Sequence, residues 1–383
     1  IASDQFQIAG GWGGGTFVGS VGVTLNNLSI KNFFKKGAWR PYPMGQNQRL
    51  SISAQTNGTY YKAFAISFTD PWMGGRKPNS FTISAHYSDE NNAYYAWQKG
   101  TRYFRTAGVA AGLGKRLDWP DPYFTFYAEA SYERYMLKDW NTFVLKNGAA
   151  NLLSIRLVLG RNSVDQPIYP RRGSDFSVSV QLTPPYSLWD GKDYKSTALS
   201  EQERYNWIEF HKWMLKGQWF TPLTRNGNLV LMARAEMGYL GHYNKNKVSP
   251  FERFEVGGDG MTGYNMYGID IISMRGYDDG ALDPVGSNYS CAYNKYTMEL
   301  RYPLLLKGQT NIYVLGFLEG GNGFTSWKEF SPFKIKRSAG IGVRLFLPVV
   351  GMVGVDWGWG FDPAAGQTKR SGSHIHFTMG MQF

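Results

Sequence analysis

Residues 80–87 read SFTISAHY, a stretch in which polar and apolar side chains alternate. With a period of two, Phe81, Ile83 and Ala85 fall on one face of an extended strand. A helix would scatter the same residues around its circumference. The stretch therefore predicts a β-strand with one apolar and one polar face.

The same alternation recurs along the chain, for example in residues 174–182 (SDFSVSVQL) and 229–237 (LVLMARAEM). An even number of such strands, with Trp and Tyr at their ends, is typical of an outer-membrane barrel, because its polar face lines the lumen and its apolar face meets lipid. Closing the sheet into a barrel pairs the backbone N–H and C=O groups of the edge strands, to which lipid cannot hydrogen-bond. We therefore predict an all-β, sixteen-stranded antiparallel transmembrane β-barrel with strands at 6–13, 16–28, 49–57, 60–69, 79–88, 102–114, 122–135, 151–161, 173–182, 204–218, 228–240, 293–302, 310–319, 334–347, 349–358 and 374–383.

Composition excludes several other classes of protein. Mean hydropathy is −0.37 and the chain has no long apolar run, which excludes a helical membrane protein. The net charge of +12 comes from Lys and Arg spread along the chain, which suits anionic lipid or lipopolysaccharide and gives no reason to expect nucleic acid. A soluble β-sandwich shares the alternation, but the aromatic strand ends favour the membrane. The single cysteine, Cys291, excludes an internal disulfide.

Two connections between the expected strands are long. Residues 30–48 lie where a short periplasmic turn is expected, and residues 241–292 form a much longer insertion on the extracellular side. Loops of that length are usually functional or disordered. The Gly and aromatic residues of 241–292 argue against disorder, so we expect a functional loop.

No motif predicts covalent chemistry. Residues 258–263 (GDGMTG) match G-x-G-x-x-G, but no helix follows them, as a dinucleotide site would need. His374 and His376 share one face of the last strand, yet the sequence offers no third metal ligand. No nucleophile elbow or HExxH motif is present. We expect no enzyme activity, no cofactor and no metal.

The long loop and its neighbours carry a family resemblance. Residues 251–284 contain a GG segment followed by Met274-Arg275-Gly276-Tyr277, and further matching stretches are TMELRYPL (297–304), VLGFLEGGNGF (314–324), KRSAGIGVRLFLPVVG (336–351) and FTDPWMGG (68–75). Taken in order, they resemble the barrel domain of the BamA family of outer-membrane assembly factors. Met274 replaces the motif's usual valine, Glu319 its usual aspartate, and the 30–48 connection is longer than expected.

The resemblance implies a function as well as a fold. It implies an outer-membrane insertase of Gram-negative bacteria that folds and inserts nascent β-barrel proteins together with accessory outer-membrane lipoproteins. The periplasmic POTRA repeats of the family are absent, so we expect residues 1–383 to be the barrel alone. The alternatives are a translocation pore, either TamA-like or of the two-partner secretion type, and a passive channel.

The resemblance also implies that the loop folds into the lumen, where Arg275 pairs with Glu299 and Glu319. A second site follows from the first and last strands. Residues 6–14 hold four glycines, which weaken a strand, and the last strand carries Gly380 and ends at Phe383. The run 374–383 (HIHFTMGMQF) also resembles the β-signal of outer-membrane barrels. We expect a lateral seam formed by Phe6, Ile8, Gly10, Gly11, Trp12, Gly13, His374, His376, Phe377, Gly380 and Phe383.

Overall fold

The fold is described from a computed structural model of the whole chain. The structure describes residues 5–13, 16–40, 42–75, 78–93, 100–260, 269–287, 289–307, 310–347 and 351–380. Side chains are described for these residues except 5–18, 307, 379 and 380.

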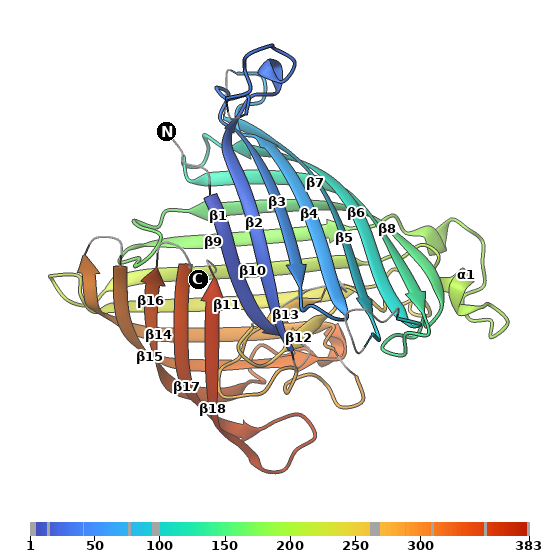
Figure 1. Cartoon of the computed structure of the whole chain (residues 1–383). Helices are drawn as coiled ribbons and strands as arrows, with labels where there is room; N and C mark the ends of the chain where they lie inside the picture. The colour runs from blue at the N-terminus through green and yellow to red at the C-terminus, as the bar shows by residue number, and fades with distance from the viewer. Residues whose placement is uncertain are drawn as a thin grey trace.

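One antiparallel sheet dominates the described residues and curls into a barrel (Figure 1). Each strand pairs with the next along the chain, except that β11 pairs with β14 across the long loop. The all-β antiparallel class expected from the sequence is confirmed. The 16 strands of this sheet are β1 (Gln5–Gly13), β2 (Thr16–Leu28), β3 (Gln48–Thr56), β4 (Tyr61–Asp70), β5 (Asn79–Asn91), β6 (Tyr103–Arg116), β7 (Phe124–Lys138), β8 (Gly148–Asn162), β9 (Gly173–Leu182), β10 (His211–Pro222), β11 (Val230–Gly241), β14 (Ala292–Lys307), β15 (Thr310–Phe324), β16 (Lys336–Leu347), β17 (Gly351–Pro363) and β18 (Arg370–Gly380).

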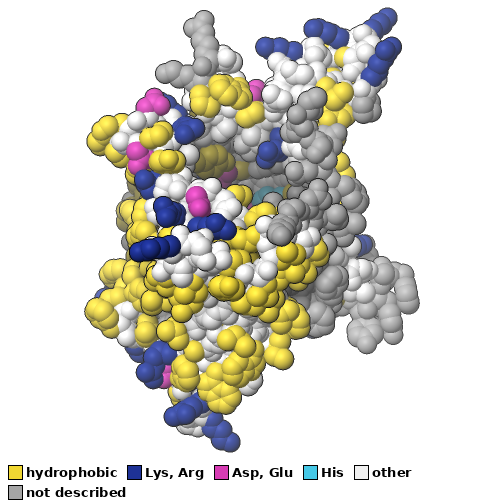
Figure 2. Space-filling model, turned by 90° about the vertical axis from the view of Figure 1, so that its left-hand side faces the viewer, with side chains coloured by type: hydrophobic (Ala, Val, Ile, Leu, Met, Phe, Trp, Pro, Cys, Tyr) yellow, Lys and Arg dark blue, Asp and Glu magenta, His cyan; other side chains and the backbone are white. Residues whose placement is uncertain are grey.

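The alternation of each strand separates a lipid-facing surface from the lumen. On β14, Met298 and Leu300 are about half exposed, whereas the intervening Glu299 is buried. Outward-facing apolar side chains of this kind form the broad apolar areas in Figure 2. None of the helices in the described part of the chain is long and apolar enough to cross a membrane.

The largest buried cluster lies inside the barrel, around the loop between β11 and β14. This loop contains β12 (Phe254–Val256) and β13 (Asp270–Ile272), two short parallel strands outside the main sheet. The loop side chains Phe251, Phe254 and Tyr277 are fully buried against the wall. The loop therefore supplies much of the barrel's internal core.

One expected strand was wrong in its first part. Residues 204–210 were expected to begin the strand that ends at 218, but Glu201–Tyr205 is a short helix, α1, and β10 begins only at His211. Ser200 caps this helix, because its hydroxyl accepts a hydrogen bond from Glu203 N while the Glu203 carboxylate reaches back to Ser200 N. The S-x-x-E spacing of this capping box was the signal available in the sequence. Other elements outside the sheet are the 3₁₀ turns Ile30–Asn32, Tyr186–Leu188 and Trp327–Glu329.

The first and last strands meet at the front of the barrel (Figure 1). β1 pairs along its full length with β2, and β18 pairs with β17. Within the residues that the structure describes, no ladder of hydrogen bonds joins β1 to β18. In the part of the chain that the structure describes, neighbouring strands are thus paired everywhere but at this seam.

Candidate functional site

Arg275 of the long loop lies against the inner wall of β14 and β15. Its Nη2 donates to Glu299 Oε1 and to Glu319 Oε1, at 2.7 Å each, and its Nε donates to Glu319 Oε1 at 3.1 Å. Its backbone N–H also donates to Glu319 Oε2 at 2.9 Å. Burial alone would lower the pKa of Arg275. The carboxylates of Glu319 and Glu299 have the larger effect, so that the pKa lies above its ordinary value. The contact expected between Arg275 and these two acids is thus present.

The wall extends this contact into a chain of alternating charges. Arg301 Nη2 forms an ion pair with Glu299 Oε2 at 2.7 Å. Asp356 Oδ1 of β17 lies 3.6 Å from Arg275 Nη1, and the Asp356 carboxylate accepts from Nη1 and Nη2 of Arg344 at 2.8 Å each. Each buried charge therefore has an opposite neighbour, which is the condition under which charges persist in a dehydrated interior. The Arg275 guanidinium also makes a cation–π contact with Phe317 of β15, because its Cζ lies 3.7 Å from the centre of that ring.

Met274 and Tyr277, on either side of Arg275 and Gly276, anchor the motif by burial and hydrogen bonds. Met274 is fully buried and its N–H donates to Gly258 O at 2.8 Å. Tyr277 is fully buried and its hydroxyl donates to Arg337 O at 2.8 Å. Burial raises the pKa of Tyr277 to about 12. The motif therefore forms a packed plug around its one charged side chain.

Gly276 touches the backbone of the wall. Its φ is +86°, a conformation that favours glycine, and an added Cβ would lie 2.9 Å from Gly360 N and 2.9 Å from Ser338 Cβ. The fit is reciprocal, because a Cβ on Gly358 would lie 2.8 Å from Gly276 N. Only a position without a side chain, on both loop and strand, allows this approach.

The motif is also hydrogen-bonded to the last strand. Gly276 N donates to His376 Nε2 at 2.8 Å, which requires that this ring nitrogen is unprotonated. Asp278 Oδ1 lies 3.2 Å from His374 Nδ1. The inward face of β18 therefore receives the loop, while Ile375 and Phe377 between and beyond the histidines are exposed on the outer face.

A second attachment lies on the opposite wall of the lumen. Phe251 stacks on Tyr135 of β7, with ring centroids 4.4 Å apart. Lys212 of β10 forms ion pairs with Glu252 at 3.3 Å and Asp270 at 2.7 Å. Burial raises the pKa of Glu252 to about 7, although Lys212 acts in the other direction. The loop thus reaches from β7 and β10 on one side to β14, β15, β17 and β18 on the other.

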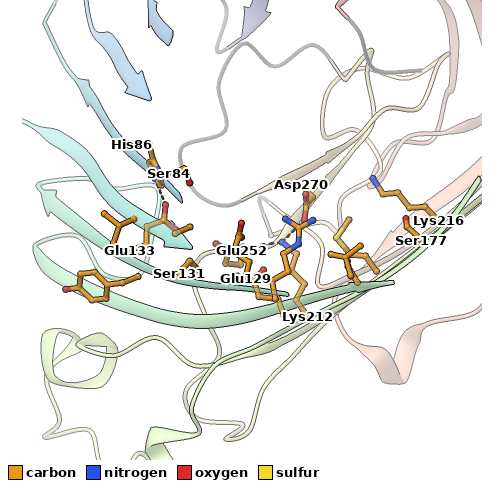
Figure 3. Close-up of a pocket in the computed structure, with 18 residues that line it drawn as sticks. Ser84, His86, Glu129, Ser131, Glu133, Ser177, Lys212, Lys216, Glu252 and Asp270 are labelled. Carbon is orange, nitrogen blue, oxygen red and sulfur yellow. Dashed lines mark hydrogen bonds and ion pairs between the residues drawn. The ribbon is translucent and has the colours of Figure 1, made fainter. Parts of the chain in front are cut away.

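A polar cavity of about 540 Å³ opens beside this second attachment (Figure 3). It is lined on one side by Lys212, Glu252 and Asp270, and on the other by His86 and Glu133. His86 Nε2 lies 2.7 Å from Glu133 Oε1. The lumen next to the loop is therefore lined by charged and hydroxyl groups, as expected for the polar face of the strands.

The far end of the loop is held by a buried acid. Asp283 Oδ1 accepts from Ser290 Oγ at 2.5 Å and from Val256 N at 3.2 Å. Burial raises the pKa of Asp283 to about 8, because these two hydrogen bonds do not fully offset the loss of water. This part of the loop is therefore most stable with a neutral carboxyl group.

The expected seam residues are placed only in part. Phe6, Ile8, Gly10, Gly11, Trp12 and Gly13 lie on β1, of which only the backbone is described. His374, His376, Phe377 and Gly380 lie on β18. Phe383 lies outside the described residues.

Sequence reasoning missed Asp356 as a charge partner, His376 as the acceptor for Gly276, and the glycines of β17 that seat the motif. A signal was present in residues 354–360 (GVDWGWG). There the outward positions are Val and Trp, so the Asp and Gly between them must face inward. The opposite attachment around Phe251 and Lys212 had no comparable signal, since strands distant in sequence supply it.

Residues 44–383 match the Omp85 superfamily domain, which is most of the chain. The chain belongs to the Omp85 superfamily. It is 22% identical over 322 residues to the outer membrane protein assembly factor BamA of Neisseria meningitidis serogroup B, covering 79% of this chain and 33% of that protein. The chain thus spans about a third of the length of that relative.

Solved structures confirm the fold. BamA of Haemophilus ducreyi lacking POTRA domains 1–3 matches with a TM-score of 0.66 at 17% identity, covering 98% of this chain and 68% of that one. CdiB from Escherichia coli matches with a TM-score of 0.57 at 12% identity, covering 98% and 61%. The resemblance to the BamA family is confirmed, and this Omp85 barrel is an integral protein of the bacterial outer membrane.

Proposed function

We propose that this barrel is an outer-membrane insertase that folds β-barrel proteins and inserts them through the seam between β1 and β18. The observation that carries the proposal is the seam itself, because no ladder joins these two strands among the described residues. An unpaired edge in lipid is costly, since each unsatisfied backbone group costs several kcal/mol. A client strand that pairs with this edge removes that cost for both partners.

The docked loop supports an insertase more than a passive channel. The loop is fastened inside the barrel, to β14 and β15 through Arg275 and to β7 through Phe251, which stacks on Tyr135. It therefore takes up lumen space that a passive channel would leave open to solutes. Templating at the seam needs no such open space, and it needs no covalent step, cofactor or metal.

The proposed partners follow from the same function. They are nascent outer-membrane β-barrel proteins, accessory outer-membrane lipoproteins of a BAM-type complex, and the surrounding lipid and lipopolysaccharide. The matched relative is named an assembly factor, which supports this assignment. A TamA-like or two-partner secretion pore is the second candidate, and the fold shared with CdiB fits it.

The test is a reversible disulfide crosslink between the two strands of the seam. In a Cys291→Ser background, cysteine pairs are introduced between residues 8–12 and 374–380, and insertion of a client barrel into vesicles is measured. Oxidation is expected to abolish insertion and reduction to restore it. The control pair is Val343→Cys with Val355→Cys, which lie opposite each other in the existing β16–β17 ladder, so that oxidation leaves the seam free. Insertion at the unlocked rate by a seam-crosslinked barrel would show that the seam is not the gate.

A further inference from the structure

The connection between β2 and β3, described except for residue 41, projects from one end of the barrel (Figure 1). Its base is closed by hydrogen bonds. Ser29 Oγ donates to Gln46 Oε1 at 3.0 Å, and Asn27 Oδ1 accepts from Gly45 N at 3.2 Å and Asn47 N at 3.1 Å. The loop is therefore built to present its tip in a fixed form.

The tip carries a cluster of exposed aromatic rings. Phe33 packs edge-on against Phe34 and Trp39, with ring centroids 5.3 Å and 5.0 Å apart. Even so, Phe34 is 92% exposed and Trp39 54% exposed. The indole N–H of Trp39 donates to Phe33 O at 3.0 Å, so its polar group is satisfied within the loop. The cluster offers apolar surface to something outside the barrel.

The charges around this cluster have one sign. Lys31, Lys35, Lys36 and Arg40 are exposed, and within the described part of the chain no ion pair holds any of them. In the sequence no acidic residue occurs between Asp4 and Asp70. Figure 2 shows Lys and Arg side chains gathered on the projection at the top of the view. A binding partner must therefore be anionic.

The position of the loop indicates which anionic partner. The strands that lead into it carry outward-facing apolar side chains, among them Val23 on β2 and Ile52 on β3, which are 41% and 53% exposed. The loop thus continues the membrane-facing surface at its rim. Aromatic rings beside Lys and Arg are the composition of a membrane interface, where rings enter the headgroup region and cations pair with lipid phosphates.

We propose that the 29–47 loop binds the anionic phospholipid surface of the leaflet at this end of the barrel. The rings of Phe33, Phe34 and Trp39 enter the headgroup region, and the four cations lie over the lipid phosphates. The loop thereby fixes the position of β2 and β3, the strands next to the seam, relative to the bilayer.

The experiment uses the full chain with Cys291→Ser and Phe34→Cys, labelled at residue 34 with an environment-sensitive fluorophore. The protein is placed in nanodiscs of phosphatidylcholine with or without phosphatidylglycerol. We expect a blue-shifted emission that brominated acyl chains quench, that requires phosphatidylglycerol, and that weakens as salt is raised. Changing Lys31, Lys35, Lys36 and Arg40 to Gln should reduce the apparent affinity for phosphatidylglycerol about fivefold per cation removed.

The matched control changes Lys192, Lys195, Lys328 and Lys334 to Gln, since these four exposed cations lie in loops at the opposite end. It should leave the emission unchanged. Heat-modifiability on gels checks that both variants are folded, and the salt titration tests the proposal on the unmodified loop if one is not. Emission that stays aqueous in both lipids, that shifts equally without phosphatidylglycerol, or that shifts only with an added soluble protein would overturn the proposal.

Discussion

Removing the Arg275 side chain tests whether the motif holds the loop to the wall. The change Arg275→Ala deletes three hydrogen bonds to carboxylates, two of them to Glu319. Breaking a buried ion pair costs about 3–5 kcal/mol when the remaining charge is left alone. Here Glu299 keeps Arg301, and Glu319 keeps Lys295 at 3.7 Å. The cost should therefore lie near the lower limit, at about 3 kcal/mol.

Amide hydrogen exchange measures this cost directly. The N–H of Gly276 donates to His376 Nε2 on β18, so it exchanges only when the loop leaves the wall, whereas the N–H of Met274 donates to Gly258 O within the loop. A loss of about 3 kcal/mol lowers the protection factor of Gly276 roughly a hundredfold. The exchange of Gly276 is the more direct readout, because its acceptor belongs to the barrel.

An arginine with similar geometry but high exposure serves as the control. Arg337 forms two hydrogen bonds to Asp362, at 3.0 and 2.9 Å, but its side chain is 64% exposed. Water replaces such a pair readily, so Arg337→Ala should leave the protection of Gly276 unchanged. A less than fivefold loss in Arg275→Ala, or an equal loss in Arg337→Ala, would refute the view that buried charge pairing docks the loop.

Three further predictions concern the same loop. Gly276→Ala should lower the protection of the motif at least tenfold, because the new Cβ meets Gly360 and Ser338 in a backbone conformation that disfavours it; normal exchange would contradict this. Tyr277→Phe should cost about 1 kcal/mol of thermal stability, through one lost hydrogen bond with packing retained, and an unchanged melting temperature would argue against that bond. Since the folded-state pKa of Asp283 is raised to about 8, loop stability should fall as pH rises from about 4 to about 8, and Asp283→Asn should flatten that fall in exchange measured against pH; an equally steep fall in the variant would assign the dependence elsewhere.

The parts of this molecule that depend on strand period were predictable from its sequence. Alternation within residues 297–301 is enough to put Glu299 on the inner face and Met298 on the outer face, as observed, and the family resemblance implied that Arg275 meets the inward acids. The same rule applied to residues 354–360 would have found Asp356. The helix at Glu201–Tyr205 was missed because the alternation rule was extended back to residue 204, while the capping box that starts the helix at Ser200 was not used.

What the sequence could not supply was the contact between elements that are distant along the chain. Lys212 meets Glu252 and Asp270 only because the loop returns across the lumen, and no local pattern encodes that return. The hydrogen bond from Gly276 to His376 spans a hundred residues. In each case the side chains are ordinary for their strands, and the loop's path decides the contact.

That path also decides which side of the seam is held. The motif touches β14 and β15 through Arg275, β17 through the backbone of Gly276, and β18 through His376, while β16 supplies the carbonyl that accepts from Tyr277. Five consecutive strands are thus fastened to one plug, and the last of them forms one edge of the seam. β1 has no ladder partner except β2 within the described residues. Under the proposed function, opening should therefore displace β1 and its neighbours away from a stationary β18, and the client strand would pair with an edge that the loop holds in place.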